Sequence, residues 1–306
     1  MKKLVLSLLL LSPALAQEIR LATNWFPEPE FGGYYAALQD GLYQKAGLEV
    51  EILPGGPQVN PLALLATGQV EVAISDAEEV LFARARGIPV VAVFALFQES
   101  PRGFMYHNSE PLHDFAELAG RTVATTPGAT LWKYIEATYS LAGQVQVVNN
   151  PGTLGPWLQD SKMVTQMFVT AEPYFARSAG ADPGWLPVSA SGFAAYESVL
   201  VVREDFAQQH PEALQAFLVA SQQGWQSFLA APGQYAATLI DANPNLDAEF
   251  IEWSAQQMRP LIEAGGTIGT MKLERWQKLA DQLGKIKLLS GNPDPAAAFK
   301  NYPSQP

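Results

Sequence analysis

The stretch LEVEILPGGPQVNPLALLATGQVEVAISD, residues 48–76, decides the fold class. Residues 48–53 alternate between apolar and acidic side chains, which predicts a half-buried strand. The prolines and glycines of 54–57 end that strand, and Asn60 then stands at the start of an apolar helical segment as its cap. Residues 70–74 repeat the strand pattern. A strand, a helix and a second strand with short connections indicate a parallel sheet covered by helices on both faces.

The same alternation extends in both directions from this stretch. Further strands are expected at 19–23, 90–96, 121–126, 144–149, 164–170 and 198–203. Helices are expected at 34–46, 76–86 (with Asp76 as cap), 130–143, 211–228, 247–258 and 273–283. The pattern breaks and restarts once, so we expect an α/β clamshell of two lobes joined by a two-segment hinge. Residues 17–103 plus 199–306 form the first lobe and 104–198 the second.

The N-terminus has the layout of a secretory signal peptide. Lys2 and Lys3 precede a short apolar run, and residues 14–16 are a small-x-small cleavage site. The apolar run is too short to span a bilayer. We therefore expect residues 1–16 to be removed after Ala16 and the protein to be periplasmic, without a lipid anchor because the chain has no cysteine.

Composition excludes several classes of function. The formal net charge of −11 opposes binding to nucleic acid and to anionic lipid. The chain has no cysteine and only three histidines, none spaced as a metal pair, so we expect no metal, no cofactor and no thiol chemistry. No Ser-His-Asp spacing or nucleophile elbow is present, and we expect no catalytic residue.

Candidate ligand-binding residues follow the expected strands, because ligands of open α/β sheets lie beyond the carboxyl ends of the strands. After the first strand come Asn24, Trp25, Phe26 and Glu30, with Tyr34 just beyond a Gly-Gly pair. Aromatic rings beside an amide and a carboxylate suit a flat polar ring. The alternative for the two tandem aromatics is burial in the core under the loop.

Four polar residues stand at other strand ends. Ser75 either reaches into the cleft or is an ordinary turn residue. Gln98 lies either at the mouth of the cleft or in a solvated turn. Thr130 opens a helix whose N-terminal amides favour acceptor atoms. Glu172 is either a cleft acceptor or a helix-start residue favoured by the helix dipole.

Two tyrosines complete the expected site. Tyr174 follows Glu172 and Pro173, and Tyr196 stands at the return to the first lobe, where it would stack a ring opposite Trp25. The expected cleft holds carboxylates and aromatics without a cation at the strand ends, which favours a neutral or cationic amine-bearing heteroaromatic over a sulfonate or nitrate.

These segments resemble the solute-binding proteins of ABC importers for thiamine-precursor pyrimidines, riboflavin and sulfonates. The resemblance is carried by Asn24-Trp25-Phe26-Pro27, by residues 31–37, by 55–57, by 84–90 and by 170–174. It implies a type II periplasmic-binding fold that closes on a small molecule and docks on an inner-membrane ABC permease. We expect a monomer that binds a thiamine-precursor pyrimidine, with riboflavin or a sulfonate or taurine as alternatives.

The resemblance extends to an enzyme that makes the thiamine pyrimidine. That enzyme has a histidine where Phe31 stands here, together with a cysteine-rich segment that this chain lacks. Both differences favour a binding protein over an enzyme. Some related binding proteins also have that histidine, so Phe31 leaves the pyrimidine ligand open. A third possible role is a sensor or adaptor that reports ligand occupancy to a signalling partner.

Overall fold

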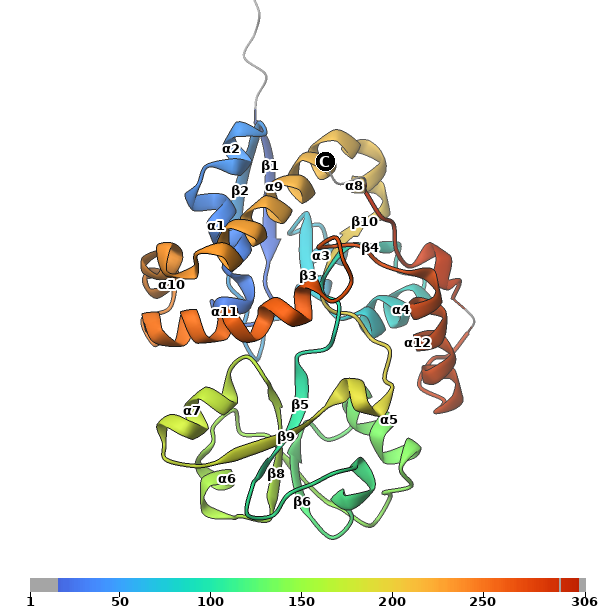
Figure 1. Cartoon of the computed structure of the whole chain (residues 1–306). Coiled ribbons are helices and arrows are strands. Elements are labelled where there is room, and N and C mark those ends of the chain that lie inside the picture. Colours follow the sequence, from blue (N-terminus) through green and yellow to red (C-terminus); the bar gives the residue numbers. More distant parts are fainter. Residues whose placement is uncertain (1–15, 292, 303–306) are drawn as a thin grey trace, which may run out of the picture.

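The computed structural model describes residues 16–291 and 293–302 and, within them, two α/β lobes that are each built on a five-stranded sheet (Figure 1). One connection between the lobes runs from β4 to β5 and the other from β9 to β10. This is the clamshell with a two-segment hinge that the sequence predicts. The expected signal peptide lies outside the described residues apart from Ala16.

The sheet of the first lobe has the strand order β2-β1-β3-β10-β4. Its strands are β1 (Gln17–Ala22), β2 (Leu48–Leu53), β3 (Val72–Ser75), β4 (Val90–Phe97) and β10 (Glu197–Arg203). Strand β1 pairs in parallel with β2 and β3, whereas β10 inserts antiparallel between β3 and β4. The sheet is therefore mixed, because the chain that returns from the second lobe enters it in the opposite direction.

Most helices belong to the first lobe. They are η1 (Pro29–Phe31), α1 (Gly32–Gln39), α2 (Leu42–Lys45), α3 (Pro61–Ala66), α4 (Ala77–Ala85), α8 (Glu204–Gln209), α9 (Pro211–Ala230), η4 (Pro232–Tyr235), α10 (Ala236–Ala242), α11 (Ala248–Glu263), α12 (Leu273–Lys285) and η5 (Pro295–Ala297). The helix expected at 34–46 is two helices, because Gly41 between them has a φ of +65°.

The second sheet has the order β7-β6-β8-β5-β9. Its strands are β5 (Arg102–His107), β6 (Thr122–Thr125), β7 (Gln146–Asn149), β8 (Met163–Phe168) and β9 (Pro183–Pro187), and its helices are η2 (Phe115–Leu118), α5 (Thr130–Thr138), α6 (Gly155–Gln159), α7 (Glu172–Ser178) and η3 (Val188–Ser191). The sequence pattern missed β5 and β9. Strand β9 begins and ends with proline, which a sheet accepts at its edge, where β9 lies.

Helix α1 packs against α9 through its first two residues. A Cβ on Gly33 would lie 2.2 Å from the Trp225 ring, and a Cβ on Gly32 would lie 2.4 Å from the Phe228 ring. The Gly-Gly pair therefore lets two large rings of α9 approach the backbone of α1.

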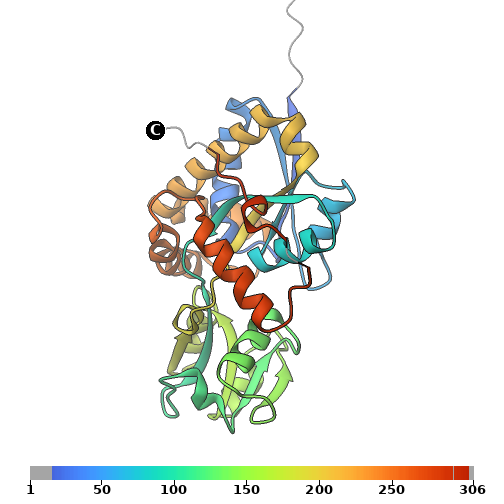
Figure 2. The same ribbon diagram turned by 90° about the vertical axis from the view of Figure 1, so that its right-hand side faces the viewer.

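The C-terminal segment runs along the first lobe. Figure 2 shows α12 descending along one side of the molecule toward the second lobe. Beyond it, the Lys300 amide donates to the Ala92 carbonyl at 2.8 Å, and Phe299 stacks on Trp276 with ring centroids 5.7 Å apart. Within the described residues no helix has both the length and the apolar character of a membrane span.

Candidate functional site

The loop after β1 presents two aromatic rings to solvent. Trp25 is 37 % exposed and Phe26 is 47 % exposed, and their rings meet edge to face at 5.4 Å. The Thr23 hydroxyl donates to the Trp25 carbonyl at 2.8 Å and accepts from the Gly55 amide at 2.9 Å. Both rings are therefore held out of the core by a bonded loop, as expected of a binding surface.

Gly55 makes this loop possible. A Cβ there would lie 2.2 Å from the Thr23 carbonyl oxygen, which is backbone and cannot move aside. The Phe26 ring lies over the next glycine, Gly56, where a Cβ would come within 3.2 Å of it. The loop after β2 thus supports the aromatic pair from below.

Carboxylates from both lobes gather beside the aromatic pair. Burial and, to a smaller extent, the nearby charge of Glu172 raise the pKa of Glu28 to about 7, against the opposing effect of a hydrogen bond from the Trp25 side chain. Burial also raises the pKa of Glu30 well above its usual range, and the charges of Glu28, Asp76 and Glu172 add to the effect. Like charges act this way only at short range. Three carboxylates of the first lobe and one of the second therefore share a region of the cleft.

Glu172 is the second lobe's member of this group. It is the first residue of α7, and its Oε2 accepts a hydrogen bond from the Phe168 amide at 2.9 Å. Burial raises the pKa of Glu172. Glu172 starts a helix, and its charge acts on Glu28 and Glu30 across the cleft, while its role as a ligand acceptor stays a prediction.

The buried Arg102 lies beside Asp76 and links the two chain segments of the hinge. The Arg102 guanidinium donates through Nε to Glu197 Oε1 at 2.8 Å and through Nη2 to Glu78 at 3.1 Å, and Nη2 also bonds Glu197. Burial alone would lower the pKa of Arg102, but the charges of Glu197, Glu78 and Asp76 outweigh it and raise that pKa. Burial raises the pKa of Glu78 to about 7 despite Arg102. Arg102 is thus committed to the hinge carboxylates.

Asp76 stands at the expected helix start, but its side chain bonds differently from expectation. It is the N-cap residue of α4, but its side chain makes no capping hydrogen bond. Its Oδ1 instead accepts from the Ser198 amide at 3.3 Å, and its Oδ2 lies 4.0 Å from Arg102 Nη2. The expected side-chain cap is therefore wrong for Asp76, while Asn60 and Asp247 do cap their helices.

A cavity opens from the strand ends of the first lobe. It has a volume of about 570 Å³, and Asn24, Ser75 and Asp76 line it together with residues of α3 and α4. The Asn24 Oδ1 atom is buried without a hydrogen-bond partner among the described residues. The structure thus brings together two of the residues expected at the site, and the volume is within the range of small-molecule sites.

Two of the expected ligand contacts are buried in packing. Tyr34 is fully buried and meets the Trp225 ring edge to face at 5.6 Å. Tyr196 is 1 % exposed, lies under the Arg275 guanidinium at 3.9 Å, and its hydroxyl accepts from the Lys272 amide at 2.9 Å. Neither ring is presented to the cleft, because hydrophobic burial and a cation–π contact engage them. The expected ligand contacts of Tyr34 and Tyr196 are therefore wrong for this structure.

Two further residues hold structural contacts. Gln98 is buried and donates to the carbonyls of Ala95 at 3.1 Å and Thr270 at 2.9 Å. Tyr174 packs against two rings of α11, Phe250 and Trp253, at 5.2 and 5.4 Å. Tyr174 therefore connects α7 of the second lobe to α11 of the first. The structure gives it a contact between the lobes in place of the expected ligand contact.

Thr130 is the first residue of α5 and is half-buried in the second lobe. It keeps its place at a strand end, and its contact with a ligand stays a prediction. The sequence pattern does not single out Glu28 or Asp76 as site residues. The Pro-Glu-Pro-Glu run of 27–30 was the available signal for Glu28, whereas nothing local distinguishes Asp76 from an ordinary helix cap.

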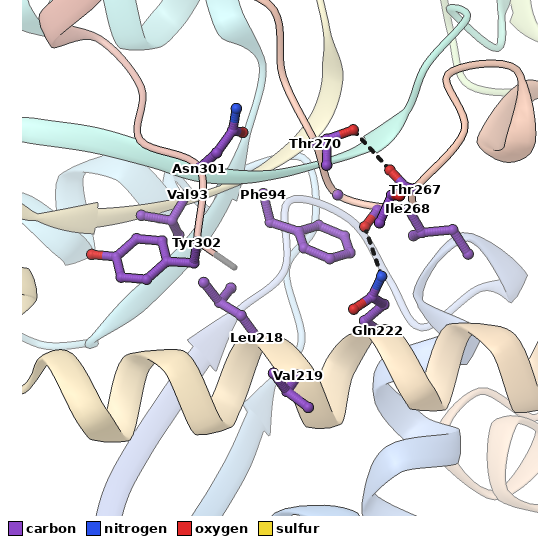
Figure 3. A pocket seen from close by; sticks show the side chains of 11 residues that line it. Val93, Phe94, Leu218, Val219, Gln222, Thr267, Ile268, Thr270, Asn301 and Tyr302 are labelled. Atoms are coloured by element: carbon purple, nitrogen blue, oxygen red, sulfur yellow. Dashed lines mark hydrogen bonds between the residues drawn. The ribbon is translucent and has the colours of Figure 1, made fainter. Parts of the chain in front are cut away.

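A second cavity is too small for a solute. It lies between β4, α9 and the 267–270 loop, has a volume of about 30 Å³, and is covered by Asn301 and Tyr302 (Figure 3). This is room for about one water molecule. The Gln222 side chain donates to the Ile268 carbonyl at 3.3 Å and ties the loop to α9. The cavity is a packing gap.

Comparison with known proteins agrees with this architecture. The family described as "NMT1/THI5 like" matches residues 28–235, more than half of the chain. The formylaminopyrimidine-binding protein of Halalkalibacterium halodurans is 24 % identical over 280 residues, covering 87 % of this chain and 84 % of that protein. The riboflavin-binding protein RibY of Chloroflexus aurantiacus is 25 % identical over 301 residues, covering 93 % and 85 %.

Other relatives carry different names. A protein of Legionella pneumophila named 4-amino-5-hydroxymethyl-2-methylpyrimidine phosphate synthase is 22 % identical and covers 94 % of this chain and 92 % of its own. Among solved structures, the periplasmic aliphatic sulphonate binding protein SsuA of Escherichia coli has a TM-score of 0.72 at 17 % identity, covering 95 % of this chain and 94 % of that one. At this identity the likeness shows the fold alone.

Proposed function

The chain belongs to the NMT1/THI5-like family, and on that premise we propose that it binds an amine-bearing heteroaromatic solute in the cleft for an ABC importer. A thiamine-precursor pyrimidine is the solute we favour. The fold is that of periplasmic-type solute-binding proteins, which close two lobes on a small molecule. The relative named as a formylaminopyrimidine-binding protein supports this choice.

The observation that carries the proposal is the set of carboxylates beside exposed aromatic rings. The charge of Glu172 in the second lobe raises the pKa values of Glu28 and Glu30 in the first, and the exposed Trp25 donates a side-chain hydrogen bond to Glu28. Carboxylates accept hydrogen bonds from amino groups, and aromatic faces attract cations and stack on flat rings. An aminopyrimidine offers both an amino group and a flat ring.

The same charges disfavour a sulfonate. A sulfonate would meet four carboxylates, and Arg102 is already bonded to Glu197 and Glu78, although Arg86 lines the cavity of the first lobe. Anion sites instead present arginine, lysine or a nest of free amides. We therefore place sulfonates and nitrate last among the ligands, although a sulfonate-binding protein shares the fold.

Riboflavin is the second candidate ligand. The relative named RibY and the cavity of about 570 Å³ favour it, since that space exceeds what a single ring fills. The polar atoms of Asn24 and Ser75 line this cavity beside apolar residues of α3. Riboflavin brings N–H donors but no positive charge, so the two candidates differ in the charge that the carboxylates would meet.

An enzyme is the alternative function, because relatives of the same family are named as synthases. In this chain Phe31 stands where the resemblance places a histidine, and Phe31 is fully buried in the first lobe. His107, the histidine of β5, stacks on Trp157 at 3.7 Å. We favour a binding protein, and a product of altered mass after incubation with a bound ligand would favour the enzyme.

The cellular setting follows from the same proposal. We propose that residues 1–16 direct export, that the mature chain works in the periplasm as a monomer, and that its closed form docks on an inner-membrane permease. Lobes 17–103 plus 199–306 and 104–198 would move as units, with the ligand stabilising the closed population through its higher affinity for it.

A thermal-shift screen of the chain from Gln17 onward, refolded to remove carried ligand, tests the function. A ligand at about 100 times its Kd adds about 2.7 kcal/mol to the unfolding free energy, which raises the midpoint by several degrees. The panel holds an aminopyrimidine, thiamine, riboflavin, taurine, an alkylsulfonate and nitrate. We expect shifts from the first two. A shift from the alkylsulfonate without one from either pyrimidine would overturn the proposal.

A further inference from the structure

Asp76 lines the cavity at the strand ends of the first lobe and contacts both hinge strands, and this placement carries an inference that rests on the function proposed above. We propose that Asp76 couples ligand binding to lobe closure. In this proposal its carboxylate accepts an N–H or cationic group of the ligand and passes the change in its position to β5 and β10.

The first step concerns the helix that Asp76 starts. A side chain at an N-cap usually accepts a hydrogen bond from the second or third amide of its helix. Asp247 does this at the start of α11, where Oδ1 accepts from the Phe250 amide at 2.7 Å. Asp76 has the same position on α4 but makes no such bond. Its carboxylate is therefore directed to other partners.

The second step is the contact with β10. Asp76 Oδ1 accepts from the amide of Ser198, which lies near the start of the strand that returns from the second lobe. Ser198 has a φ of +51°, a conformation that residues other than glycine rarely adopt. Such strained residues persist where their surroundings hold them in place. The bond from Asp76 is one of the contacts that hold this hinge residue.

The third step is the contact with β5. Asp76 Oδ2 lies 4.0 Å from Nη2 of Arg102, the first residue of β5. Arg102 in turn bonds Glu197, the first residue of β10. The two chain segments that join the lobes are thus linked to each other by Arg102 and to α4 by Asp76.

The fourth step is access from the cleft. The side chain of Asp76 is 28 % exposed and lines the cavity with Asn24 and Ser75. Its 4.0 Å separation from Arg102 is longer than a hydrogen bond, so Oδ2 can accept a donor from a ligand. A ligand donor there competes with Arg102 for Asp76. Occupancy would therefore alter the contacts of both hinge strands and shift the open and closed populations.

The test compares two helix-start aspartates. Asn caps helices about as well as Asp does, so Asp76→Asn and Asp247→Asn should behave alike if Asp76 only served α4. The chain has no cysteine, so spin labels can be attached at Glu49→Cys and Ala142→Cys, exposed positions on the two lobes. Pulsed electron paramagnetic resonance then gives the distance between lobes, and calorimetry gives the affinity for thiamine, a cationic aminopyrimidine.

We expect Asp76→Asn to weaken thiamine binding about tenfold or more, because a hydrogen bond to a charged acceptor is lost, and to alter the interlobe distances with and without ligand. Asp247→Asn should leave both unchanged. Ser198→Gly, which relieves the positive φ, should change the ligand-free distances while Asp76 stays in place.

Two results distinguish a failure of the coupling role of Asp76 from a failure of the proposed binding function. If wild-type protein binds thiamine and Asp76→Asn binds and closes as wild type does, the coupling role is wrong. If wild-type protein binds no member of the panel, the proposed function fails, and the ligand-free distances still decide the hinge role. Ligand-free interlobe distances that are identical in wild type, Asp76→Asn and Ser198→Gly would overturn the hinge role of Asp76.

Discussion

Residues 24–30 and residues 32–37 are neighbours in the chain and have opposite environments. The first segment holds exposed rings at Trp25 and Phe26 and carboxylates whose pKa values are raised by burial and mutual repulsion. The second is buried against α9, with Gly33 under the Trp225 ring. Both segments combine aromatic residues with glycine or proline. The long-range packing partner, and not the residue type, therefore determines whether an aromatic residue lies in the core or at the cleft.

The largest effect on stability is expected in the buried segment 32–37. Gly33→Ala would place a Cβ 2.2 Å from the Trp225 ring, so α1 and α9 must separate. We expect it to lower the unfolding free energy by about 3 kcal/mol, as overpacking does, measured by urea denaturation. Gly284→Ala, in α12 with open space around its Cβ, is the control and should be neutral or stabilising. An unchanged midpoint for Gly33→Ala would contradict the packing described here.

The second-largest effect is expected on ligand affinity, in the exposed segment 24–30. Trp25→Ala removes an exposed ring, so stability should change little, while the affinity for the ligand falls by about 1–3 kcal/mol, the usual range for one stacked ring. Calorimetry on the best ligand of the panel and a thermal melt of the ligand-free variant measure the two quantities. Wild-type affinity in Trp25→Ala would remove the stacking role.

The carboxylates predict an unusual dependence of stability on pH. Between about pH 4.5 and about pH 7 the folded protein keeps a proton on Glu28 that the unfolded chain has released. The unfolding free energy of the ligand-free protein should therefore fall as pH rises through this window. The slope for Glu28 alone is below about 1.4 kcal/mol per pH unit, because solvent screens a half-buried group.

Glu28→Gln isolates this contribution. Urea denaturation of wild type and variant at several pH values should show a flatter profile in the variant. Glu30 and Glu78, whose pKa values are raised by burial as well, keep the remaining slope in the same direction. Parallel profiles for the two proteins would show that Glu28 titrates normally.

The smallest effect tests Tyr196, which was expected to stack on the ligand. Tyr196→Phe removes only the hydroxyl that accepts from the Lys272 amide, which should cost about 1 kcal/mol of stability. Ligand affinity should stay at the wild-type value because the ring is buried under Arg275. A large loss of affinity with unchanged stability would return Tyr196 to the site.

Local signals predicted the elements whose ends depend on nearby residues. Asn60 caps α3 by accepting from the Ala63 amide, three residues away, as its place in the sequence predicts. The 20-residue helix α9 follows its apolar spacing from Pro211 onward. These features need no distant partner to form.

Contacts between residues far apart in the chain determine the features that the sequence did not predict. Asp76 has the sequence signal of a cap, but Ser198, 122 positions later, takes its carboxylate. Tyr196 stands at a strand end, but Arg275 covers its ring. The proline-bounded strand β9 pairs only because β5 offers it a sheet edge. No periodicity in the sequence reports such contacts.

The central claim is that the cleft selects an amine-bearing ring over an anion. The most direct measurement is a calorimetric titration of the ligand-free protein, refolded from Gln17 onward, with an aminopyrimidine and, separately, with an alkylsulfonate. We predict saturable binding of the aminopyrimidine that weakens in Glu28→Gln, and no heat of binding from the sulfonate. Saturable binding of the sulfonate alone would contradict the account.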